Sequence, residues 1–368
     1  MKNYLDFEKE IKALEEEVEA LKSPFGSEGI SEVDTKKIQQ TQAEINQKLK
    51  QTYANLNSWQ KTMVARHEDR PRANFYIKKI FSQFTLLSGD RYFGDDKSVI
   101  AGFGLIDDKS VLIIGQEKGE DLNSRIERNF GMMRPEGYRK CIRLMKLADR
   151  FQIPVISFID TPGAYPGLGA EQRGQASAIA NSIECSMSLS VPNLSIIIGE
   201  GGSGGAIALA SSNKVIMLEN SIYSVISPEG CASILWRDPS KSLQAAEAMK
   251  LTAKDLLKLG VIDEIISEPL GGAHRDPESI AADIKHSIIK NLKSFENLSK
   301  EEIYDHRKAK FLQIGRGQGF AKSTNLEGGG LSYKGANLDK IVSHFEKNKL
   351  IYAGIALLAI TGLIVLAF

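Results

Sequence analysis

Three short apolar runs, separated by turns and helical segments, constrain the fold of this chain more than any other feature. They are PVISFID at 154–160, NLSIIIG at 193–199 and KVIML at 214–218, and Ile and Val dominate them. Such runs, without polar alternation, are typical of strands buried on both faces of a parallel sheet. Helical segments at 135–151 and 170–190 precede the first two runs. Strand, turn and helix in repeated order predict a right-handed β/α crossover fold.

Two further segments predict strands or helices around this core. The runs SVIAGFGLI at 98–106 and SVLIIG at 110–115 predict a β-hairpin around Asp107 and Asp108. Near the N-terminus, apolar residues recur at alternating spacings of four and three, which predicts the seam of a short coiled-coil helix: Phe7, Ile11, Leu14, Val18 and Leu21. Its partner is either the second helical stretch, 33–56, in the same chain or a helix of another subunit.

Charge and cysteine usage exclude several classes of protein. The 368 residues hold 47 Lys and Arg against 46 Asp and Glu, a net charge of +1, so we expect no nucleic-acid partner. Any anion must therefore be bound by a local site. The three cysteines are widely spaced and form no C-x-x-C pair, which argues against a zinc site or a disulfide framework and favours a reducing cytoplasm.

The last residues have a different composition. The run LIYAGIALLAITGLIVLAF at 350–368 carries no charge and is long enough to cross a bilayer as a helix. A segment rich in Gly and polar residues precedes it, which predicts a flexible linker. We expect a cytoplasmic protein that residues 350–368 tether to the inner face of a membrane. The N-terminal residues predict neither a secretory signal nor a transit peptide.

The stretch GEGGSGGA at 199–206 matches three different chemistries. Gly199, Gly201 and Gly204 fit G-x-G-x-x-G, the dinucleotide-binding fingerprint, with Glu219 about 20 residues further on. Gly201, Ser203 and Gly205 fit G-x-S-x-G, the nucleophile elbow, with Asp263 and His274 as triad partners in the right chain order. The third interpretation is an oxyanion site formed by backbone N–H groups.

The surrounding residues favour the oxyanion interpretation. Glu200 would repel a pyrophosphate inside the dinucleotide fingerprint, and nothing near Asp263 or His274 marks a base. Consecutive glycines at a strand-to-helix turn allow N–H groups to approach a ligand without interference from Cβ atoms. A second glycine-rich turn, DTPGAYPGLG at 160–169, follows the preceding strand, so we expect both turns to line one crevice. DTPG also occurs in GTPases, but the chain has no G-x-x-x-x-G-K-[ST] loop.

Seven long motifs occur in the same order as in a known family. The chain resembles the carboxyltransferase alpha subunit of the multi-subunit bacterial acetyl-coenzyme A carboxylase over about residues 3–313. The motifs are NYLDFEKEI near the start, GDRYFGDD at 89–96, RNFGMMRPEGYRK at 128–140, FIDTPGAYPGLGAEQRGQ at 158–175, IGEGGSGGA at 198–206, YSVISPEGCASILWRDP at 223–239 and EPLGGAHRDP at 268–277.

The resemblance implies an α/β fold of the crotonase-like (ClpP/crotonase) class, a β/α superhelix, to which we add an N-terminal helical hairpin and a C-terminal apolar tail helix. The expected parts are a coiled-coil-like helical hairpin at 1–60, the carboxyltransferase domain at 61–295, a C-terminal helix at 296–313, a flexible linker at 314–345 and a transmembrane tail anchor at 346–368.

The resemblance also implies the reaction and the partners. The family transfers the carboxyl group of carboxybiotin, held on the biotin carboxyl carrier protein, to acetyl-coenzyme A, giving malonyl-coenzyme A for fatty acid synthesis. The alternative is a decarboxylase or carboxylase subunit acting on another acyl-coenzyme A. The implied partners are a carboxyltransferase beta subunit in an alpha2beta2 assembly, the carrier protein and biotin carboxylase. No metal is expected in this chain, because the family's zinc belongs to the beta subunit.

Site residues are carried over from the family by position. Gly204 and Gly205 are the expected catalytic residues, whose N–H groups stabilise negative charge on the ureido oxygen of biotin by about 3 to 4 kcal/mol each. This chemistry needs no protein nucleophile, so Ser203 becomes a turn residue. The expected substrate-binding residues are Gly163, Gly167, Gly201, Gly202 and Ala206.

Overall fold

The computed structural model describes residues 3–22, 25–26, 29–30 and 35–315. The described residues up to Ile314 form one compact unit. The predicted tail anchor, 346–368, lies outside the described residues, as does the predicted linker apart from its first two residues. In the part of the chain that the structure describes, no helix has both the length and the apolar character that a membrane span requires.

Within the described residues, eight strands form the central sheet, in the order β10-β8-β7-β6-β5-β4-β3, with β9 paired to the end of β7. The bounds are β3 Ser82–Leu86, β4 Val99–Ile106, β5 Lys109–Gln116, β6 Val155–Thr161, β7 Asn193–Gly202, β8 Lys214–Leu218, β9 Ile222–Ser224 and β10 Glu264–Ile266. From β5 to β10 the neighbours are parallel, whereas β3, β4 and β5 are antiparallel. The predicted buried strands and the predicted hairpin are confirmed.

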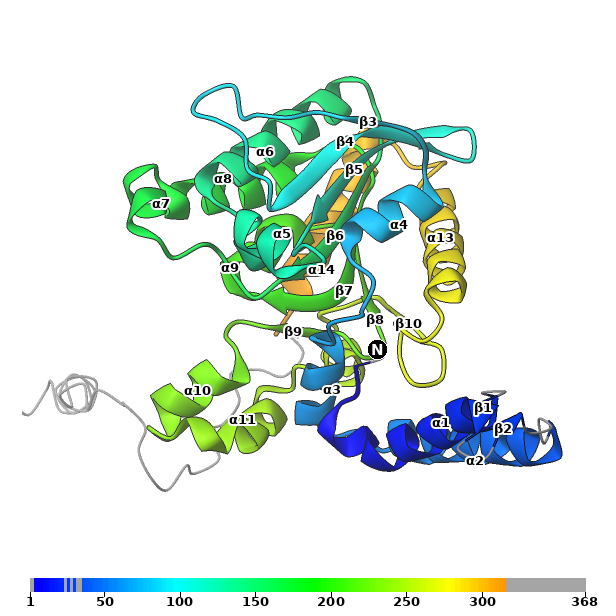
Figure 1. Ribbon diagram of the computed structural model, residues 1–368. Helices are drawn as coiled ribbons and strands as arrows, with labels where there is room; N and C mark the ends of the chain where they lie inside the picture. The colour runs from blue at the N-terminus through cyan, green and yellow to red at the C-terminus, as the bar shows by residue number, and fades with distance from the viewer. Residues whose placement is uncertain (1–2, 23–24, 27–28, 31–34, 316–368) are drawn as a thin grey trace, which may run out of the picture. The chain divides into compact units, whose positions relative to one another are not determined.

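Helices cover both faces of this sheet (Figure 1). On one face lie α6 (Pro135–Arg150) and α8 (Gln175–Ser188), and on the other lie α4 (Ala73–Ile80) and α13 (Pro277–Lys293). Successive residues of a strand point to opposite faces, so Leu112 of β5 joins the first core and Ile113 joins the second. Two apolar cores explain why these strands show no polar alternation.

Shorter elements surround these layers. The helices are α3 Ser58–Ala65, α5 Leu122–Glu127, α7 Leu168–Gln172, α9 Ser203–Ala210, α10 Pro228–Leu235, α11 Ser242–Met249, α12 Ala253–Lys258 and α14 Lys300–Gln313; the 3-10 helices are η1 Asp6–Glu8, η2 Asn129–Gly131 and η3 Pro239–Lys241; β1 Phe25–Gly26 pairs with β2 Gly29–Ile30. Helix α14 is fixed to the body by the buried Arg307, which donates to the carbonyl oxygens of Leu189 at 2.7 Å and Val191 at 2.9 Å.

The N-terminal helices pair within the chain. Helix α1 (Lys9–Lys22) packs against α2 (Thr35–Ala54) around Ile11, Val18 and Ile45. Of the two alternatives for the predicted seam, the structure therefore shows the intrachain hairpin. Ion pairs attach the N-terminal segment to the body. The guanidinium nitrogens of Arg275 lie 3.3 Å from Glu8 Oε1 and 2.5 Å from Glu15 Oε1.

Two histidine rings stack where the N-terminal segment meets the body. The ring centroids of His67 and His274 are 3.8 Å apart with an interplanar angle of 10°. His67 Nδ1 accepts the N–H of Asp69 at 3.1 Å, and its Nε2 lies 3.2 Å from the carbonyl oxygen of Asn3. Burial, then the neighbouring positive groups, lowers the pKa of His274 to about 3, and burial lowers the pKa of His67. Both rings are therefore neutral at pH 7.

Replacing His274 by Gln should weaken the pH dependence of stability. Because the folded chain holds the pKa of His274 below its unfolded value of about 6.5, the unfolded chain takes up the proton first, and stability falls as the pH drops below that value. We expect this group to remove about 1 to 2 kcal/mol of the wild-type free energy of unfolding between pH 7 and pH 5. Urea unfolding at both pH values, with the exposed His286→Gln as control, measures the difference. The same pH dependence in His274→Gln and wild type would contradict a neutral buried pair.

Candidate functional site

The stretch 199–206 forms the end of a buried strand and the start of a helix. Strand β7 runs through Gly201 and Gly202, and α9 begins at Ser203 with Gly204 and Gly205 in its first turn. Gly202, at the N-cap position, provides no side-chain capping bond. The first N–H groups of a helix have no intrahelical acceptor and lie at the positive end of its dipole. They form a ready site for a negatively charged oxygen.

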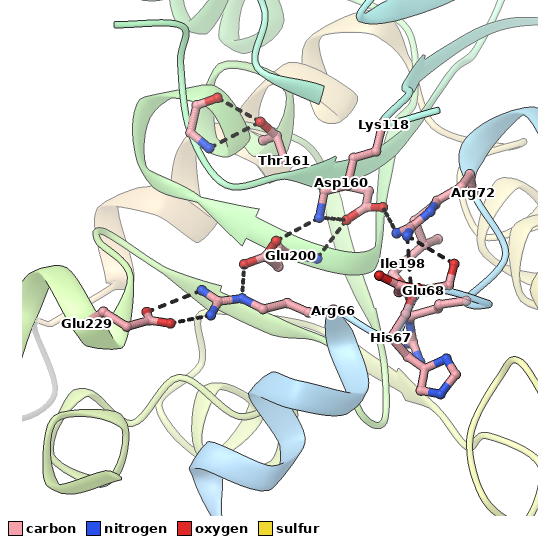
Figure 2. A network of polar contacts seen from close by, with 12 residues as sticks. Arg66, His67, Glu68, Arg72, Lys118, Asp160, Thr161, Ile198, Glu200 and Glu229 are labelled. Carbon is pink, nitrogen blue, oxygen red and sulfur yellow. Dashed lines mark hydrogen bonds and ion pairs between the residues drawn. The ribbon is translucent and has the colours of Figure 1, made fainter. Parts of the chain in front are cut away.

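The two glycine turns are in direct backbone contact. A Cβ atom on Gly205 would lie 2.6 Å from the carbonyl carbon of Gly163, and one on Gly202 would lie 2.2 Å from the carbonyl oxygen of Pro162. The hydroxyl of Thr161 donates to the carbonyl oxygen of Gly163 at 2.7 Å and accepts its N–H at 3.2 Å, as Figure 2 shows. Only glycine allows this approach, so the structure brings together the two turns that the sequence singled out.

The other predicted site residues have different surroundings. A Cβ atom on Gly204 would be 3.5 Å from Ile179, an ordinary contact, whereas one on Gly201 would be 2.9 Å from the Tyr223 ring. At Gly167, which precedes α7, it would meet the side chain of Tyr165 at 2.2 Å. Ala206 belongs to α9 and is fully buried in the core.

An apolar cavity of about 350 Å³ opens beside the start of α9. It is lined by Ser203, Gly204, Ile207, Tyr223, Ser224, Val225, Met249, Leu256 and Val261. N–H donors at the edge of an apolar space interact with charge more strongly than donors in water do. The cavity and the turns together could hold a small, largely apolar group with one negatively charged oxygen.

A network of charged side chains lies next to the turns. Lys118 Nζ is 2.7 Å from Asp160 Oδ1 and 2.7 Å from Glu200 Oε2, and Asp160 Oδ1 accepts the N–H of Glu200 at 3.0 Å. Arg66 Nε is 2.6 Å from Glu200 Oε1, and a guanidinium nitrogen of Arg72 is 3.2 Å from Asp160 Oδ2 (Figure 2). The two carboxylates stand at the ends of β6 and β7, directly before the glycine turns.

These contacts keep Glu200 ionised. Burial raises the pKa of its carboxyl group, but the charges of Lys118 and Arg66 outweigh burial and hold the pKa at about 2. Sequence reasoning treated Glu200 only as an obstacle to a dinucleotide and missed its cationic partners. The available signal was that Asp160 and Glu200 lie at the ends of two apolar runs, each close before a group of glycines.

Ser203 has the backbone of a nucleophile elbow but lacks the triad. Its φ of 52° lies in the left-handed region, and the residue is exposed at a strand-to-helix turn. Asp263 instead accepts the N–H of Val215 at 2.7 Å and pairs with Lys310. His274 stacks on His67. The structure therefore does not bring the three residues of the hydrolase interpretation together.

The dinucleotide interpretation also lacks support. A Cβ atom on Gly199, the first glycine of that fingerprint, would lie 2.5 Å from Asp160 Oδ1, so this glycine makes room for the charged network. Glu219, the expected ribose ligand, lies 4.0 Å from Lys254 and accepts the N–H of Glu268 at 3.5 Å. In the described part of the chain, no three His, Cys, Asp or Glu side chains are grouped to hold a metal ion.

Solved structures identify the fold. The transcarboxylase 12S core with methylmalonyl-coenzyme A and methylmalonic acid bound matches with a TM-score of 0.50 and 17% identity, over 61% of this chain and 41% of that longer chain. A chain of a Pseudomonas malonate decarboxylase hetero-tetramer in complex with coenzyme A matches with a TM-score of 0.52 and 14% identity, over 67% of this chain and 100% of that chain. The class is the crotonase-like α/β fold found in carboxyltransferases.

Sequence relatives are far more similar. A family model described as "Acetyl co-enzyme A carboxylase carboxyltransferase-like" matches residues 4–315. The acetyl-coenzyme A carboxylase carboxyl transferase subunit alpha of Pelagibacter ubique is 66% identical over 350 residues, 95% of each chain. That of Nitrobacter winogradskyi is 52% identical over 316 residues, 86% of this chain and 98% of the relative. This chain belongs to the family of acetyl-coenzyme A carboxylase carboxyltransferase alpha subunits, as its motifs predicted.

Replacing Ser203 by Gly tests whether this residue acts only in the turn or as a nucleophile. Glycine adopts a positive φ without strain and keeps the backbone N–H, so carboxyl transfer should stay within about threefold of wild type. If Ser203 were a nucleophile in this reaction, the variant would instead lose its carboxyl-transfer activity. Steady-state kinetics of the enzyme reconstituted with a beta subunit would decide, with Ser203→Val as the strained control.

Proposed function

We propose that this chain is the alpha subunit of an acetyl-coenzyme A carboxylase carboxyltransferase, which transfers the carboxyl group of carboxybiotin to acetyl-coenzyme A and forms malonyl-coenzyme A. The observation that carries this assignment is the backbone contact between Gly163 and Gly205 at the start of α9. A Cβ atom on Gly205 would collide with the Gly163 backbone, so a glycine at this position is what lets the two turns meet. The first N–H groups of α9 and the apolar cavity beside Gly204 together suit a ring bearing one charged oxygen.

The chemistry of this chain is electrostatic. When bound, carboxybiotin supplies the carboxyl group, and its ureido oxygen becomes negatively charged as that group leaves. The N–H groups of Gly204 and Gly205 are the proposed donors to this oxygen, with the Ala206 N–H as a further candidate. Preorganised donors of this kind contribute about 3 to 4 kcal/mol each to transition-state stabilisation. Because α9 already holds them in place, little reorganisation is needed during the reaction.

The remaining predicted site residues are assigned to the walls of the site. Gly163 and Gly202 allow the two turns to touch, and Gly201 makes room for the ring of Tyr223, which lines the cavity. Gly167 ends the second turn before α7. Through these contacts they determine the shape of the cleft that receives the substrate.

The proposed partners follow from the division of the site. The acyl-coenzyme A side is assigned to a beta subunit in an alpha2beta2 assembly, and the biotin carboxyl carrier protein and biotin carboxylase deliver the carboxyl group. The alternative function, decarboxylation or carboxylation of another acyl-coenzyme A, can use the same N–H donors. Decarboxylation differs in one testable respect, since it does not need biotin.

Gly205→Ala and Gly204→Ala provide a matched pair of variants. Both keep the backbone N–H, but a Cβ atom on Gly205 would collide with the Gly163 backbone, whereas one on Gly204 makes only ordinary contacts. We expect Gly205→Ala to lower kcat by about 100-fold and Gly204→Ala by less than about tenfold. The measurement is carboxyl transfer from malonyl-coenzyme A to free biotin by this chain reconstituted with a beta subunit.

Three results would contradict the proposal. The first is that the wild-type chain with its beta subunit transfers no carboxyl group to biotin. The second is that malonyl-coenzyme A is consumed equally fast with and without biotin. The third is that the two glycine variants are equally active. Circular dichroism and thermal unfolding check that both variants are folded.

We further propose that the apolar run at 350–368 tethers a cytoplasmic enzyme to a membrane. The full chain should then sediment with membranes, and a chain ending at Gly315 should stay in the supernatant with its transfer activity intact. Leu358→Arg, which keeps the length of the run, should also release the protein, because a cation in a membrane-spanning helix costs about 2.5 to 3.5 kcal/mol or more. Equal partitioning of the three proteins would contradict the tether.

A further inference from the structure

A single lysine joins the two strands that carry the glycine turns. Lys118 lies two residues beyond the end of β5, and its ammonium contacts Asp160 of β6 and Glu200 of β7, each at 2.7 Å (Figure 2). Asp160 stands three residues before Gly163, and Glu200 stands four residues before Gly204. The ammonium therefore connects the bases of the two turns.

Lys118 and the two carboxylates that it contacts are nearly buried. The side chain of Lys118 is 11% exposed, that of Asp160 2% and that of Glu200 10%. A Cβ atom on Gly131 would lie 2.8 Å from Lys118 Cγ and 2.8 Å from the carbonyl oxygen of Asp160, so η2 packs closely against both. Gly131 and the two preceding residues all have positive φ, and for the non-glycine residues among them this conformation is strained. A strained segment thus closes over the lysine stem.

Removal of the ammonium would leave two neighbouring carboxylates that have lost their shared cation. Arg66 and Arg72 each contact only one of the two, Glu200 and Asp160 respectively, and Arg66 is also bound by Glu229 of α10 at 2.5 Å. Among these cations, the ammonium of Lys118 alone bridges both carboxylates. Two buried carboxylates repel each other when the charge between them is removed. The strand ends would then move apart or take up water.

We propose that Lys118 is a positioning residue for carboxyl transfer: by bridging Asp160 and Glu200, it holds the two glycine turns at the separation that the N–H donors of Gly204 and Gly205 require. This inference rests on the proposed function. Lys118 acts through the backbone of the turns and need not touch the substrate. A displacement of about 1 Å at a reacting group is enough to lower a rate by about 100-fold.

The test compares Lys118→Met with a lysine of the same burial elsewhere in the chain. Lys310, whose side chain is 10% exposed, pairs with Asp263 and belongs to α14, so Lys310→Met is the matched control. In reverse transfer from malonyl-coenzyme A to biotin, with a beta subunit present, Lys118→Met should lower kcat by about 100-fold. Its KM for malonyl-coenzyme A should stay within about twofold, because that substrate is assigned to the partner. Lys310→Met should keep the wild-type kcat.

The outcomes separate the inference from the function on which it rests. An inactive wild-type pair contradicts the proposed function. An active wild type with Lys118→Met within about threefold of its kcat overturns the inference, as does an equal loss of kcat in Lys310→Met. If Lys118→Met does not fold, Glu200→Gln, which keeps the size of the side chain and removes its charge, is measured instead. A wild-type kcat in that variant overturns the inference, and a loss of kcat with unchanged KM supports it.

Discussion

The site depends on one constraint: two acidic side chains, Asp160 and Glu200, lie at the ends of neighbouring parallel strands. Strands β6 and β7 pair from Val155 with Asn193 onward, so their carboxyl ends meet at one edge of the sheet. Buried carboxylates are costly unless cations and N–H donors satisfy them. Segments from separate parts of the chain supply these partners: Arg66 follows α3 and Lys118 follows β5. Satisfying this charge therefore organises the loops around the glycine turns.

Most of the fold was predictable because its signals are local. The apolar runs became β6, β7 and β8, since burial on both faces demands continuous apolar residues. The sequence predicted that the strand ends at Gly199, whereas β7 continues to Gly202. The physical reason is a tertiary partner, because β9 pairs with Glu200–Gly202 and extends the ladder beyond the end of β8. A strand of three residues gives little local indication of where it will pair.

The site was predictable only in part, for a similar reason. Glycines at a strand-to-helix turn form a local sequence pattern, so Gly163 and Gly205 could be assigned to one crevice before their contact was known. The ion pairs could not, because Lys118 is 42 residues from Asp160 and 82 from Glu200, and no short pattern encodes a contact over that distance. Ser203 is an intermediate case, since the sequence predicted a turn residue without a triad, but it did not predict the φ of 52°.

The contact between Gly163 and Gly205 has a consequence for how this enzyme can evolve. Its atoms are main-chain atoms, which every amino acid contributes alike, so substitution cannot introduce a new functional group there and can only damage the fit. Under the proposed division of the site, which leaves the acyl-coenzyme A side to a beta subunit, selection for a different acyl group would act on that partner and not on this contact. In that division, the N–H donors proposed for this chain stay constant while the acyl substrate changes.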